Sequence, residues 1–389
     1  MQEILTARSV LPDDGTDGCL VARVWRPGIG PAIAVMRDTG VFDVTRNFPT
    51  LADLLNKPDP AEALSRVTLG ERIGSIDDIL IGSMPEARAA EVAHFLAPQD
   101  IQPVKAAGVT FAASMLERVI EEQAKGDPAK AQDVREAVRE RVGEDLSKVQ
   151  PGSQASEALK EKLIELGVWS QYLEVGIGPY AEIFTKCPPM AAVGIGAEVG
   201  LRPDSEWNNP EPEIVLVIAP SGKIVGATLG NDVNLRDIEG RSALLLGRAK
   251  DNNASCGLGP FLRFFDSTFS IDDVRQAVVA MTVTGQDNFR MEAQSSMSQI
   301  SRDPEELAKA TLSLDHQYPD GVFLMCGTMF APTDLRDGKG FTHKFGDIVE
   351  ITTPKLGRLV NRTASTQSIP GWTYGVRALM RSLAARGLA

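Results

Sequence analysis

Short strand-like runs separated by Gly and Pro dominate the hydrophobic pattern of the chain. Near its start, apolar and polar positions predict strands over Cys19–Trp25 and Ala32–Met36 and helices over Leu51–Leu55 and Met84–Leu96. The same criteria predict six later strands, over Glu182–Phe184, Ile214–Ile218, Lys223–Leu229, Ala277–Thr284, Val322–Cys326 and Ile348–Thr352. Because the long alternation of strands and helices of a doubly wound sheet is missing, we expect an α+β fold.

Helical periodicity is concentrated in two regions of the second part of the chain. A charged helical stretch runs from Ala112 to Val142 and is broken near 126–128, and a second helix is predicted from Ser156 to Leu166. We therefore expect a helical insertion around 112–168. The last helix is predicted over Thr373–Ala385, where Val376, Leu379 and Met380 are apolar.

The Pro-containing segment 97–103 is a plausible domain boundary. It predicts a smaller N-terminal α+β domain over 1–100 and a second, larger domain over 101–389.

Composition narrows the classes of function. With 389 residues, 43% hydrophobic and 24% charged, the chain is an ordinary globular protein with a large core. Its formal net charge of −12, without a basic cluster, argues against nucleic acid or anionic membranes as partners. No basic leader and no apolar run of roughly 18 residues is found, so we expect a cytoplasmic location.

Cysteine and histidine are both scarce. The four cysteines are far apart in the sequence, which is typical of reduced structural thiols: Cys19, Cys187, Cys256 and Cys326. There are three histidines, so any metal site must rely on oxygen ligands: His94, His316 and His343.

The stretch NNPEPEIVLVI, residues 208–218, joins two prolines and two glutamates directly to an aliphatic run. The run predicts a buried strand. Side chains two residues apart on a strand point to the same face, so Glu211 and Glu213 project together.

A turn follows this strand at 220–223 and returns the chain alongside it. If Ser221 and Gly222 form a two-residue turn, Glu211 lies directly opposite Asp232, and all three acids share one face. Ionised carboxylates this close repel each other unless a cation lies among them. An all-oxygen site favours Mg²⁺, Mn²⁺ or Ca²⁺. The alternative is that these acids are solvated where the strand leaves the core.

Several further motifs, in order, resemble those of the fumarylacetoacetate hydrolase family. The segment 231–237, NDVNLRD, is similar to the family's N-D-V-S-x-R-D, and 108–117 is similar to its G-x-N-Y-x-x-H-x-x-E. Residues 182–186, 326–328 and 346–351 resemble the strand before its K-P, its T-G-T and its G-D-x-V-E-V. The likeness covers about 105–365.

The resemblance implies a mixed β-roll for the second domain, which would be catalytic, and a homodimer or homotetramer. It also implies that Glu211, Glu213 and Asp232 bind a metal. One residue departs from the pattern: Ser114 stands where hydrolytic members have the histidine that pairs with a glutamate, here Glu117, and activates water.

This departure, together with the helical insertion and the segments WNNPEPE and KDNNASC, makes the chain resemble the sugar-acid dehydratases of the family. The likeness implies a metal-dependent hydro-lyase that converts a 2-keto-3-deoxy-pentonate to 2,5-dioxopentanoate (α-ketoglutarate semialdehyde), in non-phosphorylative pentose catabolism. Its partner would be a small-molecule 2-keto sugar acid, with Mg²⁺ as cofactor.

Roles for the remaining site residues follow from the same likeness. Glu182 is expected to act as the acid or base, Lys250 to stabilise the enolate or the substrate carboxylate, and Glu117 to assist as a weaker catalytic candidate. The expected substrate-binding or orienting residues are Ser114, Thr328 and Arg236. Each of these side chains also has a purely structural interpretation.

Two other functions remain open. The chain could be a C–C hydrolase of the same family that cleaves a 2,4-diketo-3-deoxy sugar acid to pyruvate and a hydroxy acid. It could also be a non-catalytic carboxylate-binding or scaffold protein on this fold.

Overall fold

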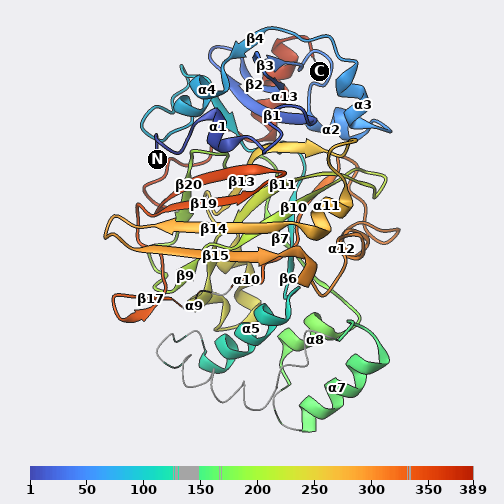
Figure 1. Cartoon of the computed structure of the whole chain (residues 1–389), viewed down its shortest axis with the longest axis vertical. Helices are drawn as coiled ribbons and strands as arrows, with labels where there is room; N and C mark the ends of the chain where they lie inside the picture. The colour runs from blue at the N-terminus through green and yellow to red at the C-terminus, as the bar shows by residue number, and fades with distance from the viewer. Residues whose placement is uncertain are drawn as a thin grey trace.

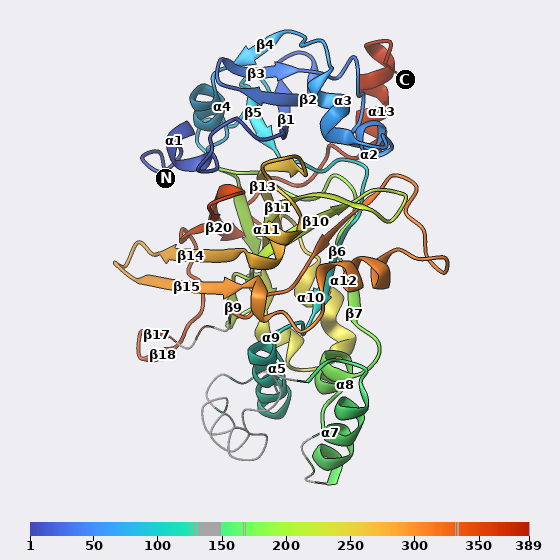
Figure 2. The ribbon, with the colours of Figure 1, turned by 45° about the vertical axis from the view of Figure 1, so that its right-hand side comes forward.

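Three tiers make up the molecule in the computed structural model (Figure 1). The structure describes residues 1–125, 127, 130, 149–165, 167, 169–330, 332 and 334–388. The N-terminal strands and the C-terminal helix lie at one end, two broad layers of strands occupy the middle, and a group of helices lies at the other end (Figures 1 and 2).

The first tier contains the N-terminal elements and the last helix. Their bounds are α1 Ala7–Val10, β1 Leu20–Arg26, β2 Gly30–Arg37, β3 Gly40–Asp43, α2 Leu51–Leu55, α3 Pro60–Ser65, β4 Arg72–Gly74, α4 Ile76–Gly82, β5 His94–Leu96 and α13 Val376–Ala385.

The middle tier is built mainly from strands. Their bounds are β6 Val104–Gly108, β7 Glu182–Cys187, β8 Glu198–Leu201, β9 Asn208–Asn209, β10 Pro212–Ile218, β11 Ile224–Asp232, β12 Asn234–Leu235, β13 Cys256–Phe264, β14 Val278–Thr284, β15 Arg290–Ser296, β16 Val322–Met325, β17 Leu335–Arg336, β18 Lys339–Gly340, β19 Ile348–Thr353 and β20 Gly357–Ser365.

The remaining elements are helices. Their bounds are α5 Ala112–Ala124, α7 Gln154–Glu165, α8 Gln171–Ile177, α9 Arg236–Glu239, η2 Ala243–Leu245, α10 Leu246–Lys250, α11 Ile271–Gln276, η3 Met297–Gln299 and α12 Pro304–Thr311. No helix in the described ranges is long and apolar enough to cross a membrane.

Two mixed sheets form the middle of the molecule, which confirms the predicted α+β class. The larger has the order β4-β3-β2-β1-β13-β11-β10-β16-β6-β7, with β5 also paired to β1, and it contains the parallel pair β16–β6. The smaller has the order β15-β14-β19-β20-β8. The main core lies between them, because Ile214, Leu216 and Ile218 of β10 belong to the same buried cluster as Met281 and Ile351.

Strand β10 is buried on both faces. Its even-numbered residues face the smaller sheet, whereas Val215 and Val217 belong to a second buried cluster on the opposite face. Glu211 and Glu213 share the parity of these valines, so they point away from the smaller sheet.

The β10–β11 hairpin reaches the predicted register by a different route. The turn contains three residues, 220–222, since the amide of Ala219 donates to the carbonyl of Lys223 (2.9 Å), so the predicted two-residue turn is wrong. A one-residue bulge at Val225, between the pairs Ile218–Ile224 and Val217–Gly226, then restores the register. As predicted, Glu211 lies opposite Asp232, whose amide donates to the Glu211 carbonyl (3.0 Å).

One prediction for the first tier is wrong. Residues 84–96 do not form the expected helix: α4 ends at Gly82 and β5 begins at His94. Strands β1 to β5 belong to the larger sheet through β1–β13 pairing. The proposed domain boundary near residue 100 stays a prediction.

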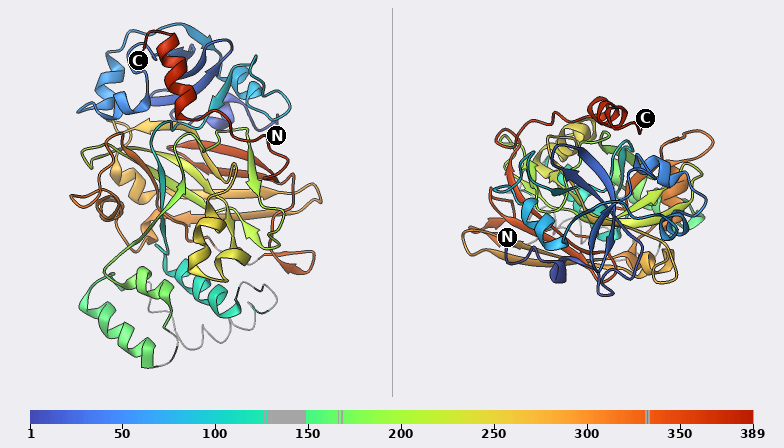
Figure 3. Two further views of the ribbon diagram at one scale, coloured as in Figure 1. Left: turned by 180° about the vertical axis from the view of Figure 1, so that it is seen from behind. Right: turned by 90° about the horizontal axis from the view of Figure 1, so that it is seen from above.

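The helical insertion begins as expected with α5 and includes α7. The remainder of the helix predicted to Val142 lies almost wholly outside the described residues. Seen from behind, α5, α7 and α8 lie below the two sheets, at the end opposite α13 (Figure 3).

Candidate active site

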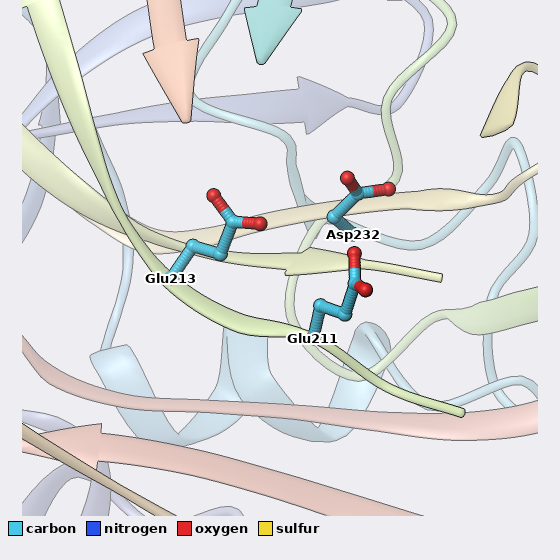
Figure 4. Close-up of side chains that lie close together, drawn as sticks. All are labelled: Glu211, Glu213 and Asp232. Carbon is cyan, nitrogen blue, oxygen red and sulfur yellow. The ribbon is translucent and has the colours of Figure 1, made fainter. Parts of the chain in front are cut away.

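Three buried carboxylates meet at the open end of the β10–β11 hairpin. One oxygen from each of Glu211, Glu213 and Asp232 lies within 4.8 Å of the others, and each residue is at most 5% exposed. Figure 4 shows the three side chains turned toward a common space. This arrangement confirms the predicted convergence of the three acids.

The backbone around β10 positions the second of these acids. Gly327 follows β16, next to β10, and its left-handed conformation (φ 84°) aims its amide at the Glu213 carboxylate, to which it donates (2.6 Å). A Cβ here would overlap the Thr110 hydroxyl, so the turn requires glycine.

Two lysines, Lys186 and Lys250, form ion pairs with the carboxylates of Glu211 and Asp232. The Lys250 ammonium bridges Glu211 and Asp232, donating to the latter at 3.0 Å. Lys186 is fully buried, forms an ion pair with the second oxygen of Asp232 (2.6 Å) and donates to the carbonyls of Val233 and Lys250. Both lysines therefore compensate the negative charge of the triad.

The pKa values show how strongly these charges interact. Burial, followed by repulsion from Asp232 and Glu211, raises the pKa of Glu213 well above its usual range. Burial alone would raise the pKa of Asp232, but Lys186 and Lys250 outweigh it and lower this pKa. Burial would lower the pKa of Lys250, but the acids around it raise it. Glu213 is the one acid of the triad that forms no ion pair with a cationic side chain among the described residues.

Glu182 enters the same pocket from β7. Burial, followed by the negative charge of Glu239, raises its pKa to about 7, against the lowering effects of Arg118 and Lys250. Strand β6 makes room for it: Gly108 pairs with Glu182, and a Cβ at Gly108 would overlap the Glu182 carboxylate. A carboxyl group that changes protonation near neutral pH thus lies beside the triad.

A second layer of ion pairs lines the pocket between α5 and α9. Arg118 pairs with Glu211 (2.6 Å), Glu121 (2.6 Å) and Glu239 (2.8 Å). Arg236 pairs with Glu121 (2.6 Å), and all are buried or nearly so. Arg118 and Lys250 thus hold different oxygens of the Glu211 carboxylate.

The remaining predicted residues lie at the same pocket. Arg236 stacks on Trp207, with its guanidinium carbon 4.2 Å from the ring centre, and pairs with Glu117 at 3.4 Å. The Ser114 hydroxyl donates to the Phe111 carbonyl (2.8 Å). Thr328 is buried, and its hydroxyl accepts from the amide two residues on.

All nine predicted site residues thus line one pocket. Their individual roles stay predictions.

The three histidines lie elsewhere. His94 stacks on Trp25, His316 stacks on Tyr318, and His343 is buried with its Nδ1 3.1 Å from Asp347. None of them is among the residues that line the pocket within the described ranges.

The donor set fits a hard divalent cation. The pocket is lined by more carboxylates than cations: Glu117, Glu121, Glu182, Glu211, Glu213, Asp232 and Glu239 against Arg118, Arg236 and Lys250. The side-chain oxygen of Asn209 also lines it, is buried and accepts no hydrogen bond from the described residues. Carboxylate and amide oxygens are the ligands that Mg²⁺ and Ca²⁺ prefer.

The family model described as fumarylacetoacetate (FAA) hydrolase C-terminal matches residues 160–364, just over half of the chain. The chain belongs to this family.

Two curated relatives are similar to part of the chain. The "2-dehydro-3-deoxy-D-arabinonate dehydratase" of Saccharolobus solfataricus is 31% identical over 191 residues, 48% of this chain and 60% of that protein. The "Probable 2-keto-3-deoxyxylonate dehydratase" of Haloferax volcanii is 31% identical over 208 residues, 54% of this chain and 68% of that protein. The match thus spans less than two thirds of the first relative.

Solved structures share the fold over a longer range. "2-keto-3-deoxy-D-arabinonate dehydratase complexed with magnesium and 2,5-dioxopentanoate" superimposes with a TM-score of 0.61 at 22% identity, covering 89% of this chain and 99% of that one. A fumarylacetoacetate hydrolase from Exiguobacterium antarcticum superimposes with a TM-score of 0.52 at 15% identity, with the same coverage. The predicted fold and family are confirmed.

Sequence reasoning missed four charged residues of this site: Lys186, Arg118, Glu121 and Glu239. Lys186 ends the segment that resembles the family's strand before K-P, but its sequence neighbours Thr185 and Cys187 gave no sign of an ion pair. Arg118 and Glu121 lie one turn beyond Ser114 and Glu117 on α5, and their i, i+3 and i, i+4 spacing places them on the same helix face. That spacing was the available signal.

Proposed function

We propose that this chain is a metal-dependent hydro-lyase acting on a 2-keto-3-deoxy sugar acid, with 2-keto-3-deoxy-pentonate as substrate and 2,5-dioxopentanoate as product. The observation that carries the proposal is the position of Glu182, a carboxyl group with a pKa of about 7, beside the three-carboxylate cluster. The dehydratase names of the two curated relatives support it.

Glu211, Glu213 and Asp232 would hold Mg²⁺ or a similar ion. When bound, such an ion supplies a Lewis acid for the carboxylate and C2 carbonyl of a 2-keto acid and so makes the C3 hydrogens more acidic. A cation would also relieve the repulsion among the three carboxylates.

Glu182 then moves the proton. As a carboxylate it takes a hydrogen from C3, and as an acid it gives that proton to the departing C4 hydroxyl, which leaves as water. Tautomerisation of the unsaturated product, with the C5 hydroxyl carbon becoming the aldehyde, completes the reaction without a net change in oxidation state. A pKa near 7 suits both halves of this exchange.

Cationic and hydroxyl groups would orient the substrate. Lys250 would neutralise the charge that develops on the C2 oxygen, while Arg236 would hold the acids of α5 in place. The Ser114 hydroxyl, which donates to the Phe111 carbonyl, would accept from a substrate hydroxyl, and the Thr328 hydroxyl would donate to one. Glu117 has a supporting role in this scheme, because it is paired with Arg236.

The histidine positions bear on the competing C–C hydrolase. That reaction needs a base for water, and no histidine lines the pocket in the described part of the chain. We therefore treat hydrolysis of a 2,4-diketo-3-deoxy sugar acid to pyruvate as the alternative outcome of the test.

The test is a mass balance on the purified protein with D- and L-2-keto-3-deoxy-pentonates, with and without Mg²⁺. The proposal expects a trapped aldehyde and one mole of product for each mole of substrate consumed, with activity lost on chelation. Pyruvate from a diketo acid would support the hydrolase instead. Full activity of Glu213→Gln or of the exhaustively chelated protein would exclude the metal-dependent reaction.

A further inference from the structure

A second cavity, separate from the candidate active site, lies between the first tier and the chain segment that leads to α13. Its volume is about 560 Å³, within the range of small-molecule sites. Strand β1, the loop between α4 and β5, and residues 369–374 contribute to its walls. It shares no lining residue with the candidate active site within the described ranges.

An arginine lines this cavity. Its buried Nη1, in Arg88, has no hydrogen-bond partner among the described residues. Burial, with no opposing acid, lowers the pKa of Arg88 to about 10, so the group is still charged at neutral pH. Among the described lining residues the one carboxylate, that of Glu198, is held by Arg362 at 2.8 Å. A half-buried guanidinium whose buried nitrogen has no acceptor favours the binding of an anion beside it.

Two other polar side chains of the cavity wall, Arg23 and His94, also carry no negative charge. Arg23 also lines the cavity, and its guanidinium donates to the carbonyls of Ala97 (3.1 Å) and Gln99 rather than to a carboxylate. Burial, followed by the charge of Arg88, lowers the pKa of His94 to about 4 and keeps it neutral. The cavity is therefore electropositive, in contrast to the negative net charge of the chain.

Aromatic side chains form the rest of the wall. Trp25 lies between His94, stacked at 6.1 Å, and Tyr374, edge-on at 5.3 Å, and its Nε1 donates to the Ala90 carbonyl (2.8 Å). The Tyr374 hydroxyl is buried and has no hydrogen-bond partner in the described part of the chain. Trp372 forms the rim, 48% exposed. A second unsatisfied polar group thus lies on the same cavity as Arg88.

The backbone of the cavity wall is strained at two places. Met190 (φ 68°) and Ala254 (φ 57°) are in the left-handed region, which residues with a side chain rarely adopt. Such conformations persist where the surrounding structure imposes them, and they cluster at binding sites.

We propose that this cavity binds a small organic anion with a flat apolar body. Its carboxylate would pair with Arg88 and accept from the Tyr374 hydroxyl, while the body would lie against Trp25 and Trp372. The proposal is independent of the function assigned to the carboxylate cluster, because the two sites share no residue.

Calorimetric titration with three probes tests the recognition. Benzoate has both the charge and the ring, benzamide has the ring without the charge, and acetate has the charge without the ring. We expect one benzoate site per chain and at least tenfold weaker binding of each of the other two. Benzamide binding as tightly as benzoate would overturn the proposal, and so would the absence of saturable benzoate binding.

Variants locate the bound probe. Arg88→Gln should weaken benzoate binding at least tenfold, about 1.4 kcal/mol, without lowering the thermal midpoint, since it removes a half-buried charge that no acid compensates. Tyr374→Phe should weaken it less. The exposed Arg66→Gln is the matched control, and Glu213→Gln should bind benzoate unchanged. Unchanged affinity in Arg88→Gln would refute the site. Equally, dissociation of an oligomer by Arg88→Gln, without benzoate binding to the wild type, would identify a subunit contact instead.

Discussion

At the scale of single residues, burial sets the proton affinity of Glu182 more than any neighbour does. Its pKa of about 7 means that the carboxylate, the form needed to take a C3 proton, is the minor form below pH 7. Glu213, at the triad, also has a raised pKa, but a bound cation would suppress it. The two acids are therefore expected to respond to pH in different ways.

Glu182→Gln should lower kcat by about 100-fold or more, the usual contribution of a general base. In the wild type kcat should fall as the pH drops below about 7, because Glu182 becomes protonated. The residual activity of the variant should lack this inflection. A pH–rate profile under saturating Mg²⁺ measures both effects.

Glu350→Gln is the matched control for this substitution. Glu350 is a half-buried strand glutamate on β19, outside the pocket, paired with Arg358. The kcat and the pH profile of Glu350→Gln should match those of the wild type. An acidic inflection that persists in Glu182→Gln would assign the titration to another group.

Lys250→Gln should destabilise the metal-free protein and increase its response to metal. Removing the ammonium leaves the buried carboxylates of Glu211 and Asp232 without one of their cationic partners. The loss of one partner of a buried ion pair costs about 3–5 kcal/mol of stability. Mg²⁺ should therefore raise the thermal midpoint more in the variant than in the wild type. Differential scanning calorimetry with and without Mg²⁺ measures the difference.

Lys105→Gln provides the comparison, because Lys105 lies on β6 and donates to the exposed Thr185. Its midpoint and metal response should be unchanged. An equal Mg²⁺ response in Lys250→Gln and the wild type would mean that the lysine does not compensate the charge of Glu211 and Asp232.

At the scale of elements, the β10–β11 hairpin shows how far local sequence rules reach. Strand parity placed Glu211, Glu213 and Asp232 on one face, although the turn has three residues rather than two. The bulge at Val225 offsets the longer turn, and nothing in the local pattern announces it. Gly226 next to it is required because a Cβ would overlap the Arg263 carbonyl, a contact made by another strand. The pairing of Glu211 with Asp232 was thus predictable from the sequence, but the turn and the bulge that produce it were not.

Other elements were predictable to different degrees for physical reasons. Helix α2 matches its predicted bounds because both its cap and its apolar face are local. The expected helix over Met84–Leu96 is wrong, since β5 gains its hydrogen bonds from β1, far away in sequence. Strand β13, which pairs with β1 and β11, was missed because Gly and Pro interrupt its apolar run. Long-range pairing forms both strands that the sequence did not predict, β5 and β13.

The β6–β7 pair yields a prediction at this scale. Gly108→Ala should reduce activity nearly as much as Glu182→Gln, because the new methyl group displaces the Glu182 carboxylate. Stability should change little, since the displaced group is the flexible end of a side chain. Steady-state kinetics and thermal unfolding on the same preparation separate the two effects.

Gly74→Ala controls for a glycine replaced on a strand. Its Cβ would lie 3.5 Å from Ile79, an ordinary contact, so activity should be unchanged. Wild-type kcat in Gly108→Ala would show that the position of Glu182 does not limit the reaction.

At the scale of the whole molecule, the two ends of the chain meet in the first tier. Helix α13 lies against the N-terminal strands, where Arg386 donates to the Pro31 carbonyl (2.9 Å) and Ser382 to the Ile29 carbonyl (3.2 Å). The first tier therefore contains residues from both ends of the sequence. The candidate active site lies at the open end of the β10–β11 hairpin. No residue of α13 lines it in the described ranges.

This separation predicts that stability and activity respond independently to changes in α13. Leu383 is 4% exposed, so Leu383→Ala should lower the free energy of unfolding by about 2–5 kcal/mol through lost burial and the cavity left behind. At temperatures where the variant is folded, its kcat should equal that of the wild type. Met380→Ala, one turn away on the same helix but 61% exposed, should alter neither quantity. Urea unfolding combined with kinetics tests this, and a kcat that falls in parallel with stability would show that the first tier is coupled to the carboxylate pocket.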